Sequence, residues 1–443
     1  MQNFIFRWFA KLRQNYWFWP SLMTLLAVVL GYSLPYLDTV LGPDWTQAVG
    51  FLRPIGVDGA RDILTTMAGA TLGVAGVAFS VTIVAVSFAS ANYGPRLISN
   101  FMGDRQNQIV LGIFVATFVY CITVLSTVHA GQVDIGLEQA AFVPQISVFF
   151  AMLLTLAAVG ALIAYIHHIP ESINIMNLTA KIGGKLQCLI IKIMDKEDAR
   201  VHDPANVAAW REASPVEGSE IIRARAAGFL QQFDLESLAS IARAQRTQIA
   251  LHCAPGDFLL PGDTIMSAGP VKHGDASITG QMRECYTQGS NRTDVQDVLF
   301  LSEQLVEVLV RALSPGINDP HTALLCLNWL HTGLAEFARR RPARPAQSSD
   351  PVLYRRITFE DMLDRSFDMM RQHIASDTIV TLHALGILAD TAAVASRADM
   401  AEACVRQMHR LAGSAKECLG ESVAREEVDA VLHRGLAKAV WQN

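Results

Sequence analysis

Four long apolar stretches in the first 170 residues constrain the fold of this chain more than any other feature. They cover residues 17–37, 63–91, 109–128 and 141–169, and none of them contains Asp, Glu, Lys or Arg. A transmembrane helix needs about 20 predominantly apolar residues, so the sequence predicts four such helices. Proton relays and ion-coupled carriers usually place ionisable groups inside the membrane, and the sequence therefore argues against both classes.

The flanks of these stretches predict which way the chain faces. No small-residue cleavage site follows the first stretch, so we interpret it as a retained anchor rather than a signal peptide. The loop 129–140 has no Lys or Arg. The basic residues on the opposite side are Arg7, Lys11, Arg13, Arg96 and Arg105. Lys and Arg are enriched in cytosolic loops, so both termini are predicted to be cytosolic.

The two halves of the chain differ in composition. Residues 1–170 have no net charge, and residues 171–443 carry the whole formal charge of −5. The sequence therefore predicts a lipid-embedded half followed by a mildly acidic soluble half, with no basic surface for nucleic acid. The seven cysteines form no CxxC pair, which argues against a disulfide framework or a zinc site and favours a reducing compartment.

The second stretch is unusually rich in small residues, as in "MAGATLGVAGVAFSVTIVAVSFAS" at 67–90. Its small and hydroxylated side chains recur every three or four positions, which places them on one helix face. These residues are Gly69, Gly73, Gly76, Ser80, Ser87 and Ser90. The stripe fits a close helix–helix seam with Gly69 and Gly73 as a GxxxG element. It also fits a pore lining, in which several copies surround a water-filled axis.

Two polar features adjoin the predicted spans. The loop 92–108 carries Asn92, Arg96, Asp104 and Arg105, which we interpret either as a turn held by caps and ion pairs or as a hinge or gate. The paired residues His167 and His168 close the fourth stretch. Adjacent rings on a helix point about 100° apart, so the pair suits anchoring at the membrane interface better than a shared metal site.

The soluble half divides into three predicted parts. Residues 171–218 read as a connecting helix and a linker, and 219–290 as a small β module with a helix capped near Asp234 and two Pro-Gly-Asp turns. That order is similar to barrel-sandwich hybrid domains of the lipoyl type, but no Lys lies between Lys196 and Lys272 to carry a cofactor. Residues 291–443 are predicted to be helical.

The predicted helical part contains several distinct signals. Thr293 and Gln296 have the spacing of a capping box, which predicts a helix from Asp294 to about Leu313. Further helices are expected at 358–373, 376–396, 398–418 and 421–440.

The segment "ALSPGINDPHTALL" at 312–325 predicts a corner between two helices. Asp319 suits an N-cap and Pro320 the first helical position. A second interpretation gathers Ser314, Asn318, Asp319 and His321 around a small ligand, an ion or another subunit. One carboxylate, one amide and one histidine do not make a cation cage, so we expect no metal here.

Three stretches resemble a family of predicted bacterial membrane proteins known only as a domain of unknown function (DUF2254). They are "NYGPRLISNFMGDRQNQIVLGIFVATFVYC", "PGDFLLPGD" and "RTDVQDVLFLSEQLVEVLVRALSPGINDPHTA". The resemblance implies four N-terminal spans, an inner-membrane location and a cytosolic tail. It implies no activity and no catalytic residue.

Two functional hypotheses follow from these features. The first is a homo-oligomeric channel-like protein in which the second span lines a narrow pore and the cytosolic half forms a regulatory collar. The second is a membrane-anchored regulator or scaffold whose cytosolic half binds a ligand or partner. An enzyme is the weakest alternative, because no G-x-S-x-G, Walker or HExxH pattern occurs, and no cofactor is expected.

Overall fold

The computed structural model describes residues 17–41, 55–94, 104–129, 132–134, 137–139, 142–198, 219–269, 276–340 and 351–440. The chain divides into two compact units, Met1–Asn174 and Ile175–Asn443.

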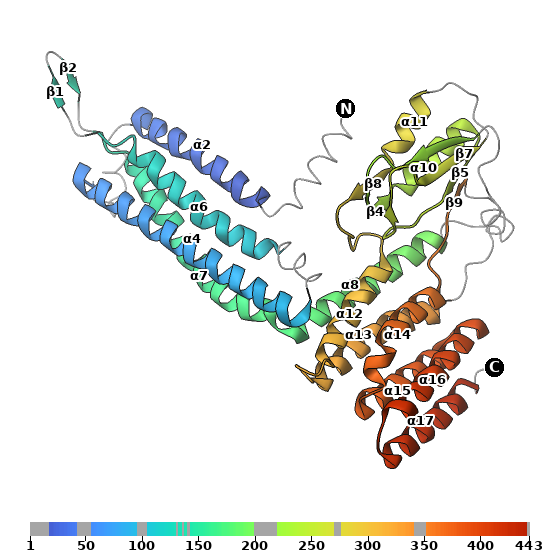
Figure 1. Ribbon diagram of the computed structural model, residues 1–443. Helices are drawn as coiled ribbons and strands as arrows, with labels where there is room; N and C mark the ends of the chain where they lie inside the picture. The colour runs from blue at the N-terminus through green and yellow to red at the C-terminus, as the bar shows by residue number, and fades with distance from the viewer. Residues whose placement is uncertain are drawn as a thin grey trace. The chain divides into compact units, whose positions relative to one another are not determined.

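The first unit is built on four apolar helices, each long enough to cross a membrane (Figure 1). They are α2 (Phe18–Leu41), α4 (Val57–Tyr93), α6 (Arg105–Leu125) and α7 (Gln145–Ile173). Each overlaps one of the predicted spans, so the prediction of four membrane-crossing helices is confirmed. A short hairpin of β1 (Gln132–Asp134) and β2 (Leu137–Gln139) stands between α6 and α7.

Small residues let these helices pack closely. One core cluster joins all four helices around Tyr120, and a second joins α4, α6 and α7 around Phe114. Polar ties reinforce the first cluster near the start of α7. The carboxylate of Asp38 accepts hydrogen bonds from the backbone N–H groups of Ile146 and Ser147, at 2.9 and 3.1 Å. A side chain from α2 therefore satisfies free N–H groups at the start of α7.

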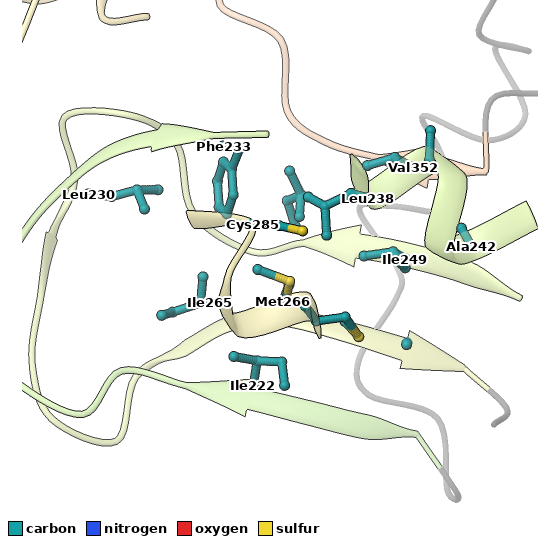
Figure 2. Packing of buried hydrophobic residues seen from close by; sticks show 14 of the residues in the cluster. Ile222, Leu230, Phe233, Leu238, Ala242, Ile249, Ile265, Met266, Cys285 and Val352 are labelled. Atoms are coloured by element: carbon teal, nitrogen blue, oxygen red, sulfur yellow. The ribbon is translucent and has the colours of Figure 1, made fainter. Parts of the chain in front are cut away.

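The β module has two small sheets around one core. The first sheet pairs β3 (Glu220–Arg223), β7 (Thr264–Gly269), β5 (Gln248–Leu251) and β9 (Val352–Leu353) in that order. The second pairs β6 (Phe258–Leu259), β4 (Gly228–Phe233) and β8 (Tyr286–Gly289). Figure 2 shows the apolar core that these strands share with the helix α10 (Leu235–Gln245). A second short helix, α11 (Ala276–Arg283), precedes β8.

The local predictions for this module are largely confirmed. Asp234 caps α10 by accepting from Ser237 N, and the two Pro-Gly-Asp turns flank β6. The strand β9 was not predicted, and it pairs in parallel with β5 from a distant part of the sequence.

The predicted capping box at Thr293 and Gln296 is wrong. The helix α12 (Val298–Ala312) begins later, and its N-cap is Asp297, which accepts from Phe300 N. Gln296 instead reaches across to β4, where its amide accepts from Phe233 N and donates to Phe233 O, both at 2.9 Å. The Gln296 side chain, which the capping box required, therefore makes a tertiary contact with β4 instead.

The helical part of the second unit packs as successive pairs of helices. The helix α8 (Ile175–Asp198) lies against α12 and α13 (Pro320–Arg339), and α13 packs on α15 (Thr378–Val394). The remaining helices are α14 (Phe359–Ile374), α16 (Ala398–Cys418) and α17 (Ser422–Val440). The last four helices confirm the predicted ranges. In the predicted connecting helix and linker at 171–218, α8 extends to Asp198, and residues 199–218 lie outside the described residues, as do residues 341–350.

Candidate functional site

The helix α4 has two small-residue faces, and only one of them packs within the chain. The packed face is an alanine stripe that the sequence analysis missed. It consists of Ala60, Leu64, Ala68, Thr71, Ala75, Ala78, Thr82, Ala85 and Ala89, all buried. These residues recur at helical spacing, so the same periodicity that marked the glycines could have found them.

The glycine/serine face is the other one. No atom of the described residues lies within 4 Å of the Cβ position of Gly69, Gly73 or Gly76, leaving aside the helix's own nearby backbone. Ser80 and Ser87 are exposed, and Ser90 is half-buried. The six predicted residues therefore share one face of α4, and within a single chain that face has no packing partner among the described helices.

The Ser80 hydroxyl of this face is hydrogen-bonded within its own helix. Ser80 Oγ donates to Gly76 O at 2.9 Å. On the packed face, Thr82 Oγ1 lies 2.8 Å from Tyr165 Oη of α7, and Tyr165 also donates to Ala78 O. The hydroxyls of Thr82 and Tyr165 are thus hydrogen-bonded between α4 and α7. These bonds hold the alanine face of α4 against the other helices of the first unit.

The predicted hinge loop is described only at its two ends. Asp104 is the N-cap of α6, accepts from Gln106 N, and lies 3.0 Å from His168 Nε2. Asn92 donates to Phe88 O within α4, Arg105 is exposed, and Arg96 lies outside the described residues. The Asp104–His168 pair joins α6 to α7. Sequence reasoning missed this pair because 64 residues separate its members.

The predicted corner is a tightly hydrogen-bonded turn. Asp319 caps α13 through Thr322 N, at 3.1 Å, and Pro320 occupies the first turn. The hydrogen bond from the Thr322 hydroxyl is the main cause that lowers the pKa of Asp319. Asn318 has a φ of 48°, in the left-handed region that Asn tolerates better than most residues.

The four predicted corner residues contact one another mainly through the backbone: Asn318 N donates to Ser314 O at 2.9 Å, and the backbone N–H of His321 is among the groups that lower the pKa of Asp319. Ser314 Oγ donates to Arg311 O, while Asn318 and His321 are exposed. The helix corner is therefore explained by its own backbone, and ligand binding there remains a prediction.

A buried charge network that the sequence did not reveal joins the β module to α12. Arg292 contacts Asp297 at 2.8 Å and Glu303 at 2.7 Å, and Arg365 of α14 contacts Glu303 at 2.9 Å. Both carboxylates are 2% exposed. Burial is the main cause that raises the pKa of Asp297, and Arg292 opposes it.

This network is satisfied by its own members and offers no open ligand position. Both oxygens of Glu303 accept from arginines, and those of Asp297 accept from Arg292 and Phe300 N. Across the described ranges, no three His, Cys, Asp or Glu side chains gather in a way that could hold a metal ion.

Comparison with known proteins places the chain in a family. The family model described as "Predicted membrane protein (DUF2254)" matches residues 13–390. Uncharacterized proteins of Mycobacterium bovis and Mycobacterium tuberculosis are 29% identical over 279 residues, which is 61% of this chain and 51% of theirs. The chain thus aligns with about half the length of these curated relatives. No solved structure matches it. The chain belongs to the DUF2254 family of predicted membrane proteins.

Proposed function

We propose that this membrane protein is a homo-oligomeric, channel-like protein in which the glycine/serine face of α4 lines a narrow axial path. The observation that carries the proposal is the exposed row of Gly69, Gly73 and Gly76, opposite an alanine face that is already packed. Helices in membranes associate where small residues let two backbones approach closely. A glycine row left open in one chain is such a surface for a second copy.

The length of α4 supports a role beyond anchoring. Its 37 residues extend about 55 Å at 1.5 Å per residue, whereas a hydrocarbon core is about 30 Å thick. The excess must tilt or project from the bilayer. Ser80, Ser87 and Ser90 follow the glycines along the same face. In a symmetric assembly, neighbouring copies of α4 would approach most closely at the glycines, and the serine hydroxyls would lie further along the helix.

In this proposal the protein lies in the bacterial inner membrane with both termini cytosolic, as the basic flanking residues predict. The soluble unit would form the collar, and the loop carrying Asn92, Arg96, Asp104 and Arg105 would connect it to α4 as a hinge or gate. A small ligand or ion would act through the soluble unit. The two small sheets and the paired Pro-Gly-Asp turns support a barrel-sandwich-like docking module within it.

The alternative is a membrane-anchored regulator or scaffold whose soluble unit binds a ligand or partner. One observation favours it. Because Ser80 already donates to its own helix, the stripe can be a dry seam that needs no water. The glycine row would then hold copies together without conducting, and residues 175–443 would carry the function.

Oligomeric state in nanodiscs tests the shared part of both hypotheses. We expect full-length protein to run as an oligomer by native mass spectrometry, and the double variant Gly73→Leu/Gly76→Leu to run as a monomer. The matched control is Val77→Leu/Val84→Leu on the same helix, where the side chains are 65% and 68% exposed. A monomeric wild-type protein, or an equal effect of the control, would contradict the proposal.

Conduction separates the two hypotheses. The channel proposal predicts single-channel currents in planar bilayers from wild-type protein and from the valine control, with none from the glycine variant. An intact oligomer that passes no current would leave the regulator. In that case, capture of a specific partner by the soluble unit should persist in the glycine variant.

A further inference from the structure

The corner between α12 and α13, residues 313–319, lies at a defined place in the soluble unit. Three contacts fix the register of α8 against α13. Gly183 faces Trp329, Gly333 faces Leu186, and Asp195 pairs with Arg340 at 2.6 Å.

These contacts set the direction of the two helices. Residues further along α8 contact residues further along α13, and the difference in residue number between the partners stays nearly constant. The two helices therefore run parallel. The first residue of α13, Pro320, is then level with the first residue of α8, Ile175. The corner that precedes Pro320 therefore lies beside the beginning of α8 (Figure 1).

The beginning of α8 is tied to the membrane by the chain itself. Only Asn174 separates α8 from the last residue of α7, Ile173. The predicted fourth span ends at Ile169, so Ile175 follows it by about 9 Å at helical rise. Packed helices lie about 8–10 Å apart, so the start of α13 lies within about 20 Å of Ile169, whichever direction α8 takes.

The corner presents an apolar side chain on a rigid turn. Ile317 is 46% exposed, beside the exposed residues Pro315 and Gly316. The backbone behind it is held by Asp319 N to Ala312 O and Asn318 N to Ser314 O, at 2.8 and 2.9 Å. Because the backbone of Ile317 is already held in place, its side chain loses little further conformational entropy when it enters a lipid headgroup layer.

The first two turns of α8 show the same character. Met176 is 58% exposed, whereas Leu178, Ile182 and Leu186 further along the same helix are buried. Lys181 is exposed one turn further on. Apolar side chains flanked by a long cationic one are typical of the membrane interface, where the ammonium group reaches the phosphates.

We propose that the α12–α13 corner contacts the headgroup layer of the bilayer that holds α7, with Ile317 inserted at its surface. The contact would set the soluble unit against the membrane at a second point besides the chain connection. It does not depend on channel activity or on oligomer formation.

Fluorescence quenching of full-length protein in nanodiscs tests the proposal. The exposed cysteines Cys188 and Cys418 are replaced by serine, and an environment-sensitive dye is attached at Ile317→Cys. The matched control is Leu260→Cys, 56% exposed in the β module beside the opposite end of α12. Gly316→Cys serves as a second site, because no described atom lies within 4 Å of its Cβ position.

Phosphatidylcholine discs doped with lipid that is spin-labelled near the headgroup should quench the dye at 317 and 316 and leave the dye at 260 unaffected. Equal quenching at the corner and at 260, whether strong or absent, would overturn the proposal. A blue shift at 317 that resists the spin label and grows with the number of chains per disc would also overturn it. That result would assign the corner to a second copy of the protein.

Discussion

The helices α4 and α8 both carry glycines, but Gly183 of α8 packs against another helix of the chain, whereas Gly69, Gly73 and Gly76 of α4 do not. Gly183 lies against Trp329, whose Cβ is 2.7 Å from where an alanine methyl would stand, and Gly333 of α13 lies against Leu186. Gly69, Gly73 and Gly76 of α4 have no described atom within 4 Å of their Cβ positions. A glycine that is already in contact with another helix cannot accept a larger side chain without strain, whereas an open glycine in a membrane helix is available for a contact with another molecule.

Two adjacent residues of α8, Gly183 and Gly184, differ in whether a methyl group would meet another helix. Gly183→Ala should lower the free energy of unfolding by about 3 kcal/mol, because the new methyl overlaps rigid ring and Cβ atoms of Trp329. Gly184→Ala meets no described atom within 4 Å and should raise stability by about 0.5–1 kcal/mol, as alanine favours the helix. Chemical denaturation followed by circular dichroism measures both, and equal effects would break the comparison.

The two Pro-Gly-Asp turns offer a second pair. Gly256 and Gly262 have φ values of 99° and 98°, so alanine strains both turns alike. A methyl on Gly256 would also collide with Asp297, which Arg292 and Phe300 N hold in place. We expect Gly256→Ala to cost about 2 kcal/mol more than Gly262→Ala. Thermal denaturation of the two variants gives this difference, and a difference near zero would mean that Asp297 yields freely.

A smaller effect is expected where the neighbour can move. Gly333→Ala places its methyl 2.9 Å from Leu186 Cδ2, the far end of a side chain that can rotate. The loss should be about 1 kcal/mol. Denaturation should recover most of it in the double variant Gly333→Ala/Leu186→Val if the clash is the cause. No recovery would place the strain in the backbone.

The smallest effect belongs to the open glycines. Gly73→Ala meets no described atom of its own chain and should favour the folded monomer by about 0.5 kcal/mol. Thermal stability in a detergent that keeps the protein monomeric measures this. A clear loss of stability there would mean that the glycine face has a partner within the chain after all.

The same contrast explains what the sequence could predict. The four membrane helices and α14–α17 follow from local hydrophobicity and periodicity, and the turns beside β6 follow from Pro-Gly-Asp. The sequence also places the glycine/serine stripe on one face of α4, because its residues recur every three or four positions. It did not identify the alanine stripe as the face that packs, because two small-residue stripes on one helix give the same periodic signal.

Contacts between distant segments explain the other failures. Gln296 has the spacing of a capping residue, but Phe233, 63 residues away, offers it two backbone hydrogen bonds. Asp104 and His168, and likewise Arg365 and Glu303, come together only once helices have packed. No local pattern distinguishes these charged residues from solvated ones.

The single residue between α7 and α8 has a mechanical consequence. Since α8 packs on α13 at Gly183, Gly333 and Asp195, it is part of the second compact unit. One pair of backbone torsion angles, those of Asn174, joins α8 to the last of the four apolar helices. A change in the direction of α8 relative to α7 therefore requires rotation about the bonds of this residue or unwinding of a helix end.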